Sequence, residues 1–158
     1  MNAPPAVHRV GVISDTHNLV RPEAMLALAG SDLIIHAGDI CAAEVLRELE
    51  QIAPVIAVRG NNDRGEWADK LHVSEVVEVG GFSLYVLHNL AELDLSPRAA
   101  GIAVVISGHS HKPLLEEKDG VIYLNPGSAG PRRFALPISV ATLRISDRVV
   151  CELVTLAL

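Results

Sequence analysis

The sequence is poor in aromatic residues, in cysteines and in long apolar runs. Its aromatic side chains are one tryptophan, two tyrosines and two phenylalanines, so any core must be largely aliphatic. No stretch reaches the roughly 20 apolar residues that cross a bilayer, and the N-terminal segment lacks the basic and apolar regions of a signal peptide. Two cysteines, Cys41 and Cys151, do not suggest a disulfide framework. We expect a soluble cytoplasmic protein with free thiols and no membrane partner.

Basic residues are also scarce. Lysine and arginine together number 13 against 19 acidic residues, which gives a formal net charge of −6. Arg132 and Arg133 form the one pair of adjacent basic residues, so no basic track is available for a nucleic-acid backbone. A chain of 158 residues buries about two-thirds of its unfolded surface, enough for one substantial core. We therefore predict a single domain over residues 1–158.

The first half of the chain alternates apolar strands with helices. Residues 7–13, 33–35 and 55–58 are short runs rich in β-branched residues, whereas residues 22–29 and 42–51 have the composition and spacing of helices. Strands that are apolar throughout are typical of a parallel sheet covered on both faces. In such sheets, functional groups gather beyond the carboxyl ends of the strands.

The second half of the chain indicates strands in antiparallel pairs. Alternating segments around Gly80-Gly81 and around the turn at 118–120 predict two hairpins. The strands expected here are residues 73–79, 82–87, 99–106, 114–117, 121–124, 138–145 and 149–154. The chain therefore combines parallel βαβ units in its first half with antiparallel pairing in its second half, which predicts an α/β fold.

Five short motifs place polar residues directly after these strands. They are S-D-T-H with Asp15 and His17, H-A-G-D with Asp39, G-N-N-D with Asn61, the single His88, and G-H-S-H with His109 and His111. Each motif alone recurs by chance, but their order along the chain is informative. Carboxylate, imidazole and amide groups together suit divalent transition metals and exclude a thiolate-type zinc site.

Each of these residues also has an ordinary structural interpretation. Asp15 and Asp39 could be helix N-caps, because aspartate often follows a strand in that role. Asn61 could simply occupy a left-handed turn, and His109 and His111 could be loop histidines with satisfied hydrogen bonds. These interpretations would have to hold for all seven residues together. That is improbable, because buried carboxylates and imidazoles normally need partners.

The motif order resembles that of the calcineurin-like metallophosphoesterases. The small size, S-D-T-H, H-A-G-D, G-H-S-H and the N-P-G-S segment at 125–128 resemble their compact bacterial and archaeal phosphodiesterase branch, the YfcE type. The resemblance covers residues 10–128. It implies a four-layer αββα sandwich of two mixed β-sheets flanked by helices, with a dinuclear metal centre at the sheet ends.

The resemblance also implies how the metal ligands are shared. One metal would be bound by Asp15, His17 and His111, the other by Asn61, His88 and His109, and Asp39 would bridge the two. Asp39, Asn61 and His88 would act in catalysis with a metal-bridged hydroxide. Two such cations hold a phosphoryl oxygen and a nucleophile together, so we expect a small-molecule phosphate ester as substrate. From the family we expect Mn²⁺, with Fe, Co, Ni and Zn as alternatives.

Two positions depart from the family pattern. Many relatives have a histidine after the metal-binding asparagine, where it acts as general acid; here the residue is Asn62, which cannot donate a proton with a useful pKa. This favours diesters with good leaving groups, although a phosphomonoesterase or nucleotide hydrolase remains an alternative. The second departure is Asn89, where a glycine is common. Asparagine tolerates a left-handed backbone, so it can take the place of glycine, but the change could alter the placement of His88.

Residues outside the motifs give weaker predictions. Asn62, Arg132 and Arg133 are candidates for binding the substrate, and Gly127 and Ser128 for shaping the pocket wall. His36 reads as a hydrogen-bonded core residue that supports the site. Relatives with this fold form dimers or tetramers, so a homodimer or homotetramer is expected. A non-enzymatic alternative is a metal-poor binding scaffold like the retromer subunit that shares the fold.

Overall fold

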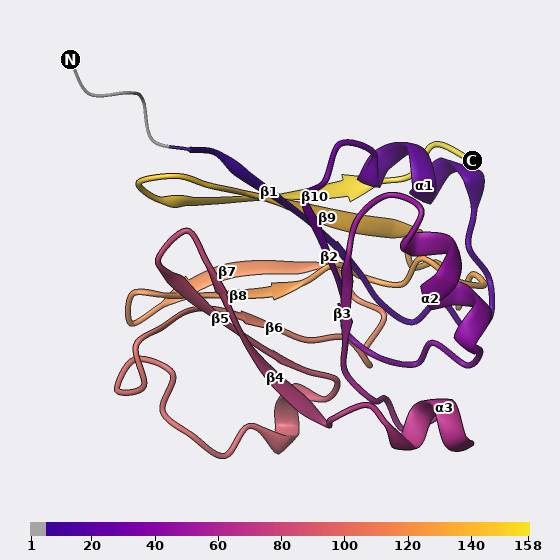
Figure 1. Cartoon of the computed structure of the whole chain (residues 1–158), viewed down its shortest axis with the longest axis horizontal. Coiled ribbons are helices and arrows are strands. Elements are labelled where there is room, and N and C mark those ends of the chain that lie inside the picture. The colour runs from indigo at the N-terminus through magenta and orange to yellow at the C-terminus, as the bar shows by residue number, and fades with distance from the viewer. Residues whose placement is uncertain (1–5) are drawn as a thin grey trace.

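The computed structural model describes residues 6–158, which form two five-stranded β-sheets packed face to face (Figure 1). The strands of the first sheet are β1 (His8–Ile13), β2 (Leu33–His36), β3 (Val55–Ala57), β9 (Ser139–Ile145) and β10 (Val149–Thr155). The strands of the second sheet are β4 (Ser74–Val79), β5 (Phe82–Leu87), β6 (Ile102–Ile106), β7 (Leu114–Lys118) and β8 (Val121–Asn125).

Both sheets are mixed, as predicted. The first has the order β10-β9-β1-β2-β3, in which β1, β2 and β3 are parallel and β9 and β10 are antiparallel to their neighbours. The second has the order β4-β5-β6-β8-β7, with β5, β6 and β8 parallel. Parallel pairing brings the carboxyl ends of several strands to one rim of the sandwich, and that rim holds the site described below.

The core between the sheets is aliphatic. Val12 and Ile35 of the first sheet and Val86 and Ile106 of the second are completely buried in one cluster. Full burial of such a side chain is worth about 1.5–3 kcal/mol. Tyr85 is the one aromatic residue that is buried within residues 6–158, which agrees with the expectation of an aliphatic core.

Two helices cover the outer face of the first sheet. These are α1 (Pro22–Leu28) and α2 (Ala43–Leu49), which lie on the same side of that sheet in Figure 1. Leu28 of α1 and Leu49 of α2 are completely buried in a second cluster that includes Ile34 of β2. The βαβ pattern read from the first half of the chain is therefore confirmed.

The outer face of the second sheet is covered mainly by loop. Within residues 6–158, the only regular element in this cover is the 3-10 turn η1 (Leu90–Glu92). Leu90, Leu93 and Leu95 pack against a buried cluster that contains Tyr85 and Val105. The sandwich of two mixed sheets is confirmed, with this segment as the outer layer on the second sheet.

Some boundaries differ from those expected. The helix predicted over 42–51 ends at Leu49, because residues 50–53 turn back toward β3. The strand predicted from residue 99 begins at Ile102, since residues 97–101 form a turn. The short helix α3 (Glu66–Asp69) was not predicted.

None of the helices within residues 6–158 is long and apolar enough to cross a membrane. The expectation that the N-terminal segment is not a signal peptide concerns, in part, residues 1–5, which lie outside the described range.

Candidate metal centre

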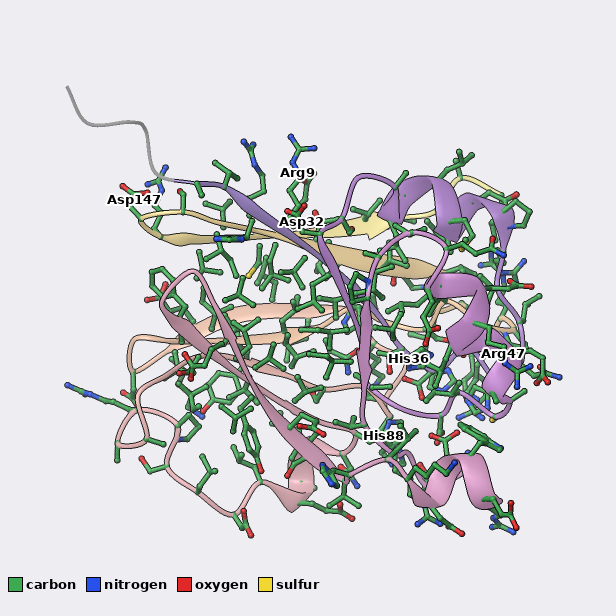
Figure 2. All side chains as sticks on the ribbon, viewed as in Figure 1. Arg9, Asp32, His36, Arg47, His88 and Asp147 are labelled. Carbon is green, nitrogen blue, oxygen red and sulfur yellow. The ribbon has the colours of Figure 1, made fainter. Side chains whose placement is uncertain are left out.

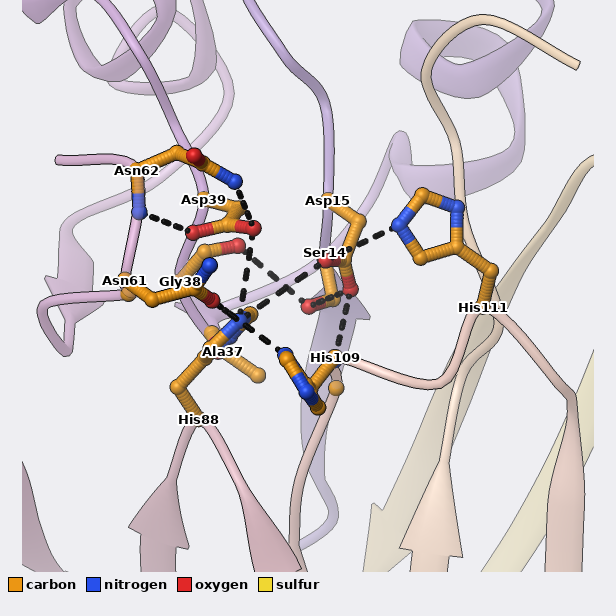
Figure 3. Close-up of polar contacts among 12 residues, drawn as sticks. Ser14, Asp15, Ala37, Gly38, Asp39, Asn61, Asn62, His88, His109 and His111 are labelled. Atoms are coloured by element: carbon orange, nitrogen blue, oxygen red, sulfur yellow. Dashed lines mark hydrogen bonds and ion pairs between the residues drawn. The ribbon is translucent and has the colours of Figure 1, made fainter. Parts of the chain in front are cut away.

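The seven residues singled out in the sequence meet at one rim of the sandwich. Each comes from a loop that follows a parallel strand: Asp15 and His17 follow β1, Asp39 follows β2, Asn61 follows β3, His88 follows β5, and His109 and His111 follow β6. Figure 3 shows six of these side chains pointing toward one another from opposite sheets. Residues up to 96 positions apart in the chain thus share one site.

Asp15 lies at the centre of the group. Its Oδ1 is 3.4 Å from His111 Nε2 and 3.9 Å from the Nε2 atoms of both His17 and His88. Asp39 is the second central carboxylate, with Oδ2 3.4 Å from His88 Nε2 and 3.7 Å from His17 Nε2. Two overlapping groups, Asp15-His17-His111 and Asp15-Asp39-His88, each bring three ligand atoms within 4.8 Å of one another.

Asn61 and His109 extend this group toward solvent. The side-chain oxygen of Asn61 lies 2.9 Å from His88 Nε2 and 3.2 Å from His109 Nδ1. Asn61 and His109 are exposed, whereas Asp15, Asp39, His88 and His111 are buried. The site therefore has a buried floor and an edge that opens to solvent on the side of Asn61 and His109.

The buried atoms fit a cation. Asp15 Oδ1 and His17 Nε2 are both buried and have no hydrogen-bond partner within residues 6–158. A buried carboxylate oxygen without a hydrogen bond is costly unless a positive charge compensates it. Oxygen and imidazole donors are the set that manganese, iron, cobalt, nickel and zinc accept. The donor geometry is thus that of a site able to hold divalent ions.

The pKa values of the acidic groups follow from these contacts. Burial alone would raise the pKa of Asp39, but the close contact with His88 and the hydrogen bonds from Asn62 outweigh it and lower that pKa well below its usual range. Burial likewise opposes ionisation of Asp15, yet the close contact with His111 and the hydrogen bond from Ser14 leave its pKa lowered. For His88 burial acts to lower the pKa, and contacts with Asp39 and Asp15 raise it on balance. Both carboxylates are therefore ionised at neutral pH, as metal ligands must be.

Five of the seven residues have an unusual backbone conformation. Asp15, His17, Asp39, His109 and His111 all have positive φ, between 44° and 71°. This region is disfavoured for residues with a side chain, and such strain persists only where surrounding contacts impose it. The conformation turns side chains of the D-x-H and H-x-H pairs toward the same rim. Neither aspartate caps a helix, since α1 and α2 begin after Arg21 and Ala42 without a side-chain cap, so the N-cap interpretation is wrong.

Asp63, which is not among the seven residues, holds two of these loops together. Its Oδ2 accepts hydrogen bonds from the backbone N–H groups of Gly60 and Asp39, at 2.7 and 3.0 Å. Its Oδ1 accepts from Ile40 and Cys41, both at 2.8 Å. One buried carboxylate thus ties the loop after β2 to the loop after β3. The signal was present as the last letter of G-N-N-D, but only the fold shows what that aspartate binds.

His36 supports the site from within the core, as expected. It is completely buried, its Nδ1 accepts the N–H of Gly38 at 3.1 Å, and its Nε2 lies 3.0 Å from Thr16 Oγ1 (Figure 2 labels its position). Because Nδ1 is an acceptor, Nε2 carries the proton and donates to Thr16. Burial lowers the pKa of His36 to about 3, so the ring is neutral.

The two departures from the family pattern have clear structural effects. Asn62 donates to both oxygens of Asp39, from its backbone N–H and from its side-chain amide, each at 2.9 Å. It therefore orients Asp39 directly. Asn89 has an extended backbone with φ −111°, and its side chain accepts from Ala91 N at 3.0 Å. A left-handed conformation is not needed there, and His88 stays within the site.

The N-P-G-S segment supports the site from behind. Asn125 donates to the carbonyl of Gly108 at 3.0 Å, and Ser128 donates to the carbonyl of Asp15 at 3.0 Å. Ser128 is buried, so the expectation that it forms part of the pocket wall is wrong. Gly127 adopts φ 79°, and a Cβ there would overlap Ser139 Oγ. Both residues fix the loops that carry the ligands.

The side chains of Arg132 and Arg133 make no contact with the group of seven in the described chain. Both residues are exposed, and neither side chain makes a hydrogen bond or ion pair within residues 6–158. The arginines that lie beside the site are Arg59 and Arg64. They line a pocket of about 340 Å³ that also contains Asn61, His88 and His109. In the sequence, Arg59 and Arg64 directly flank the G-N-N-D motif at 60–63, and this position is the one signal that could have identified them.

Comparison with known proteins agrees with this architecture. A family model described as the calcineurin-like phosphoesterase superfamily domain matches residues 9–148. A probable metallophosphoesterase of Methanothermobacter thermautotrophicus is 38% identical over 148 residues, covering 86% of this chain and 85% of the relative. Among solved structures, an archaeal phosphodiesterase superimposes with a TM-score of 0.79 at 25% identity, covering 94% and 99% of the two chains. Vacuolar protein sorting 29 of Cryptosporidium parvum superimposes with a TM-score of 0.81 at 22% identity, covering 96% and 92%.

Proposed function

Because the chain belongs to the calcineurin-like phosphoesterase superfamily, we propose that it is a metal-dependent phosphodiesterase that hydrolyses small phosphate diesters. The observation that carries this proposal is the position of Asp15 Oδ1. This oxygen is completely buried, has no hydrogen bond within residues 6–158, and faces three imidazole nitrogens at 3.4–3.9 Å. A charged oxygen in these surroundings is matched to a bound cation.

The proposed ligand sets follow the grouping of the side chains. Asp15, His17 and His111 would hold one cation, Asn61, His88 and His109 the other, and Asp39 would lie between them. When bound, two such cations supply a water of lowered pKa as the nucleophile and positive charge for the phosphoryl oxygens. We expect Mn²⁺ as the native metal of both positions, with Fe, Co, Ni or Zn as alternatives.

The chain's own groups orient this chemistry. His88 donates from Nδ1 to the carbonyl of Ala37 at 2.7 Å, which directs Nε2 into the site. The N–H of His109 donates to Asp15 Oδ2 at 3.0 Å and fixes that carboxylate. Asn62 donates to Asp39 instead of presenting an acid to the leaving group. Esters whose leaving groups depart without protonation are therefore favoured.

Two alternative functions make different predictions. A phosphomonoesterase or nucleotide hydrolase would prefer p-nitrophenyl phosphate, whereas the absence of an acidic group at Asn62 favours diesters. A binding scaffold would need no metal. The likeness to vacuolar protein sorting 29, at 22% identity, concerns the fold alone, and all seven ligand positions are retained in this chain.

The test compares metal content with activity. Protein purified without chelator is analysed for metals and assayed with added Mn²⁺ on bis-p-nitrophenyl phosphate and p-nitrophenyl phosphate. Asp39→Asn should lower diester turnover at least about 100-fold, since even outer-shell partners are worth 10–100-fold. Asp147→Asn, an exposed residue at the β9–β10 turn, is the control. A metal-loaded, fully active Asp39→Asn protein would end the proposal.

A further inference from the structure

The pocket beside the candidate centre opens between two loops. The loop after β3 contributes Arg59, Asn61 and Arg64, and the loop after β5 contributes Asn89 and Glu92. The pocket includes the exposed edge of the group of seven, where Asn61 and His109 lie, and also contacts the buried His88. A substrate held at the centre would place its second substituent here.

Arg59 is a fixed cation in this pocket. Its Nε donates to the backbone carbonyl of Asp63 at 3.2 Å, and its guanidinium pairs with Asp69 of α3 at 3.5 Å. Its side chain keeps 37% of its surface exposed. A guanidinium held in this way loses little conformational entropy when it binds an anion.

Arg64 is a free cation on the same wall. Its side chain is exposed and has no hydrogen bond or ion pair within residues 6–158. Guanidinium groups stay protonated at every physiological pH and bind carboxylates or phosphates through paired N–H donors. Arg64 thus offers a positive charge that no acidic side chain of the described chain neutralises.

The acidic residues of the pocket do not cancel both arginines. The carboxylate oxygens of Asp63 are each occupied by two backbone N–H groups, so they face away from a ligand. Glu92 is the one remaining carboxylate on the pocket wall. Asp69 already pairs with Arg59, so Arg64 is the guanidinium of the pocket wall that has no acidic partner within residues 6–158.

We infer that this pocket selects phosphate diesters whose second alcohol carries an anionic group, either a carboxylate or another phosphate. The inference rests on the proposed function for the position of the phosphodiester, and it assigns Arg64 and Arg59 to the recognition of the added charge. The negative charge of Glu92 repels the anionic group of the substrate and so limits the affinity of the pocket for it. Arg59, Arg64 and Glu92 lie outside all the motifs identified in the sequence, although the two arginines directly flank G-N-N-D.

Equilibrium binding tests the inference without relying on turnover. Calorimetry compares butylphosphonate with 4-phosphonobutyrate and propane-1,3-bisphosphonate, which add a carboxylate or a second phosphonate at similar length. The wild-type protein should bind one or both anionic compounds more tightly, and the ratio shows which anion is preferred. Arg64→Gln should reduce this preference about two- to fivefold, the range of a partly exposed ion pair. Glu92→Gln should increase it by a similar factor.

Arg47→Gln is the matched control. Arg47 is an exposed arginine on α2 that pairs with Glu44 and lies away from His88 in Figure 2, so its loss removes the same charge from another surface. High salt should also weaken the preference for the anionic compounds. Equal binding of all three phosphonates by the wild-type protein, or an unchanged preference in Arg64→Gln, overturns the inference.

Turnover separates this inference from the proposed function. The substrates are two phosphate diesters of p-nitrophenol, one with butanol and one with 4-hydroxybutyrate as the second alcohol. Both release p-nitrophenolate as the leaving group. A higher kcat/KM for the carboxylate ester, lowered by Arg64→Gln relative to the butyl ester, supports both. No hydrolysis of either ester, with the phosphonate preference intact, counts against the phosphodiesterase function and leaves the anion pocket supported.

Discussion

Replacing Asp63 with asparagine tests how the site is held together. The carboxylate of Asp63 accepts four backbone hydrogen bonds of 2.7–3.0 Å, from Gly60, Asp39, Ile40 and Cys41. Asparagine has the same shape but only one acceptor oxygen. Its amide group would point donor hydrogens at two backbone N–H donors, and these two would remain buried without partners.

The expected cost follows from the two bonds that are lost. A hydrogen bond to a charged group contributes about 1.5–3 kcal/mol, so Asp63→Asn should lower the free energy of unfolding by about 3–6 kcal/mol. Domains of this kind have total stabilities of about 5–15 kcal/mol, so the change removes a large share. Because Asp39 itself provides one of the four N–H groups, the loop that carries this carboxylate should also shift, and metal affinity should fall.

Urea unfolding with chelator present measures this effect, because the chelator removes any contribution from bound metal. Circular dichroism follows the transition, and elemental analysis of protein purified without chelator follows metal retention. Asp147→Asn is the control: Asp147 is exposed and accepts only from the neighbouring Ser146, so a change within about 0.5 kcal/mol is expected. A loss below about 1 kcal/mol in Asp63→Asn would refute the reasoning that this carboxylate ties the two loops.

Three further predictions follow from individual side chains. The pKa of His36 is about 3 when folded against 6.5 when unfolded, so the unfolded chain binds the extra proton and stability falls by up to about 1.4 kcal/mol per pH unit below 6.5. His36→Gln should flatten this slope in urea midpoints measured from pH 7 to 4, and parallel slopes would contradict it. A Cβ on Gly60 would overlap Asp39, so Gly60→Ala should lower the free energy of unfolding by about 2 kcal/mol or more. Thermal or urea unfolding measures this change, and an unchanged transition would show that the loops can separate. Burial raises the thiol pKa of Cys41 and Cys151 to about 11, so alkylation by iodoacetamide should be slow at pH 7 and should accelerate about tenfold per pH unit. Mass spectrometry follows the labelling, and rapid labelling at pH 7 would be inconsistent with those pKa values.

The sequence was informative where local patterns have one dominant cause. Alternation of apolar strands with helices in the first half predicted the parallel β1-β2-β3 unit, because such strands must be buried on both faces. The seven candidate residues of the site could be named since each follows a strand, and parallel strands end at one rim. His36 was recognised as a core residue because a histidine inside an apolar strand is normally hydrogen-bonded there.

The sequence was misleading or silent where contacts join distant segments. Arg132 and Arg133 were named as the adjacent basic pair, and the structure leaves both side chains exposed and unpaired in the described chain, so their role in substrate binding stays a prediction. Arg59 and Arg64 appear unremarkable in the sequence, and they line the pocket because the loops after β3 and β5 face each other. Ser128 was expected on the pocket wall and is buried behind Asp15.

The sequence alone determined which chemical groups this protein can bring to a phosphate ester, since the order of its motifs fixes their type and their place at strand ends. Only the tertiary structure decided how those groups are held. Asp63 binds the N–H groups of two loops, and Asp15, His17, Asp39, His109 and His111 keep left-handed backbones. Both features depend on contacts between segments remote in sequence, and such contacts leave no periodic pattern along the chain.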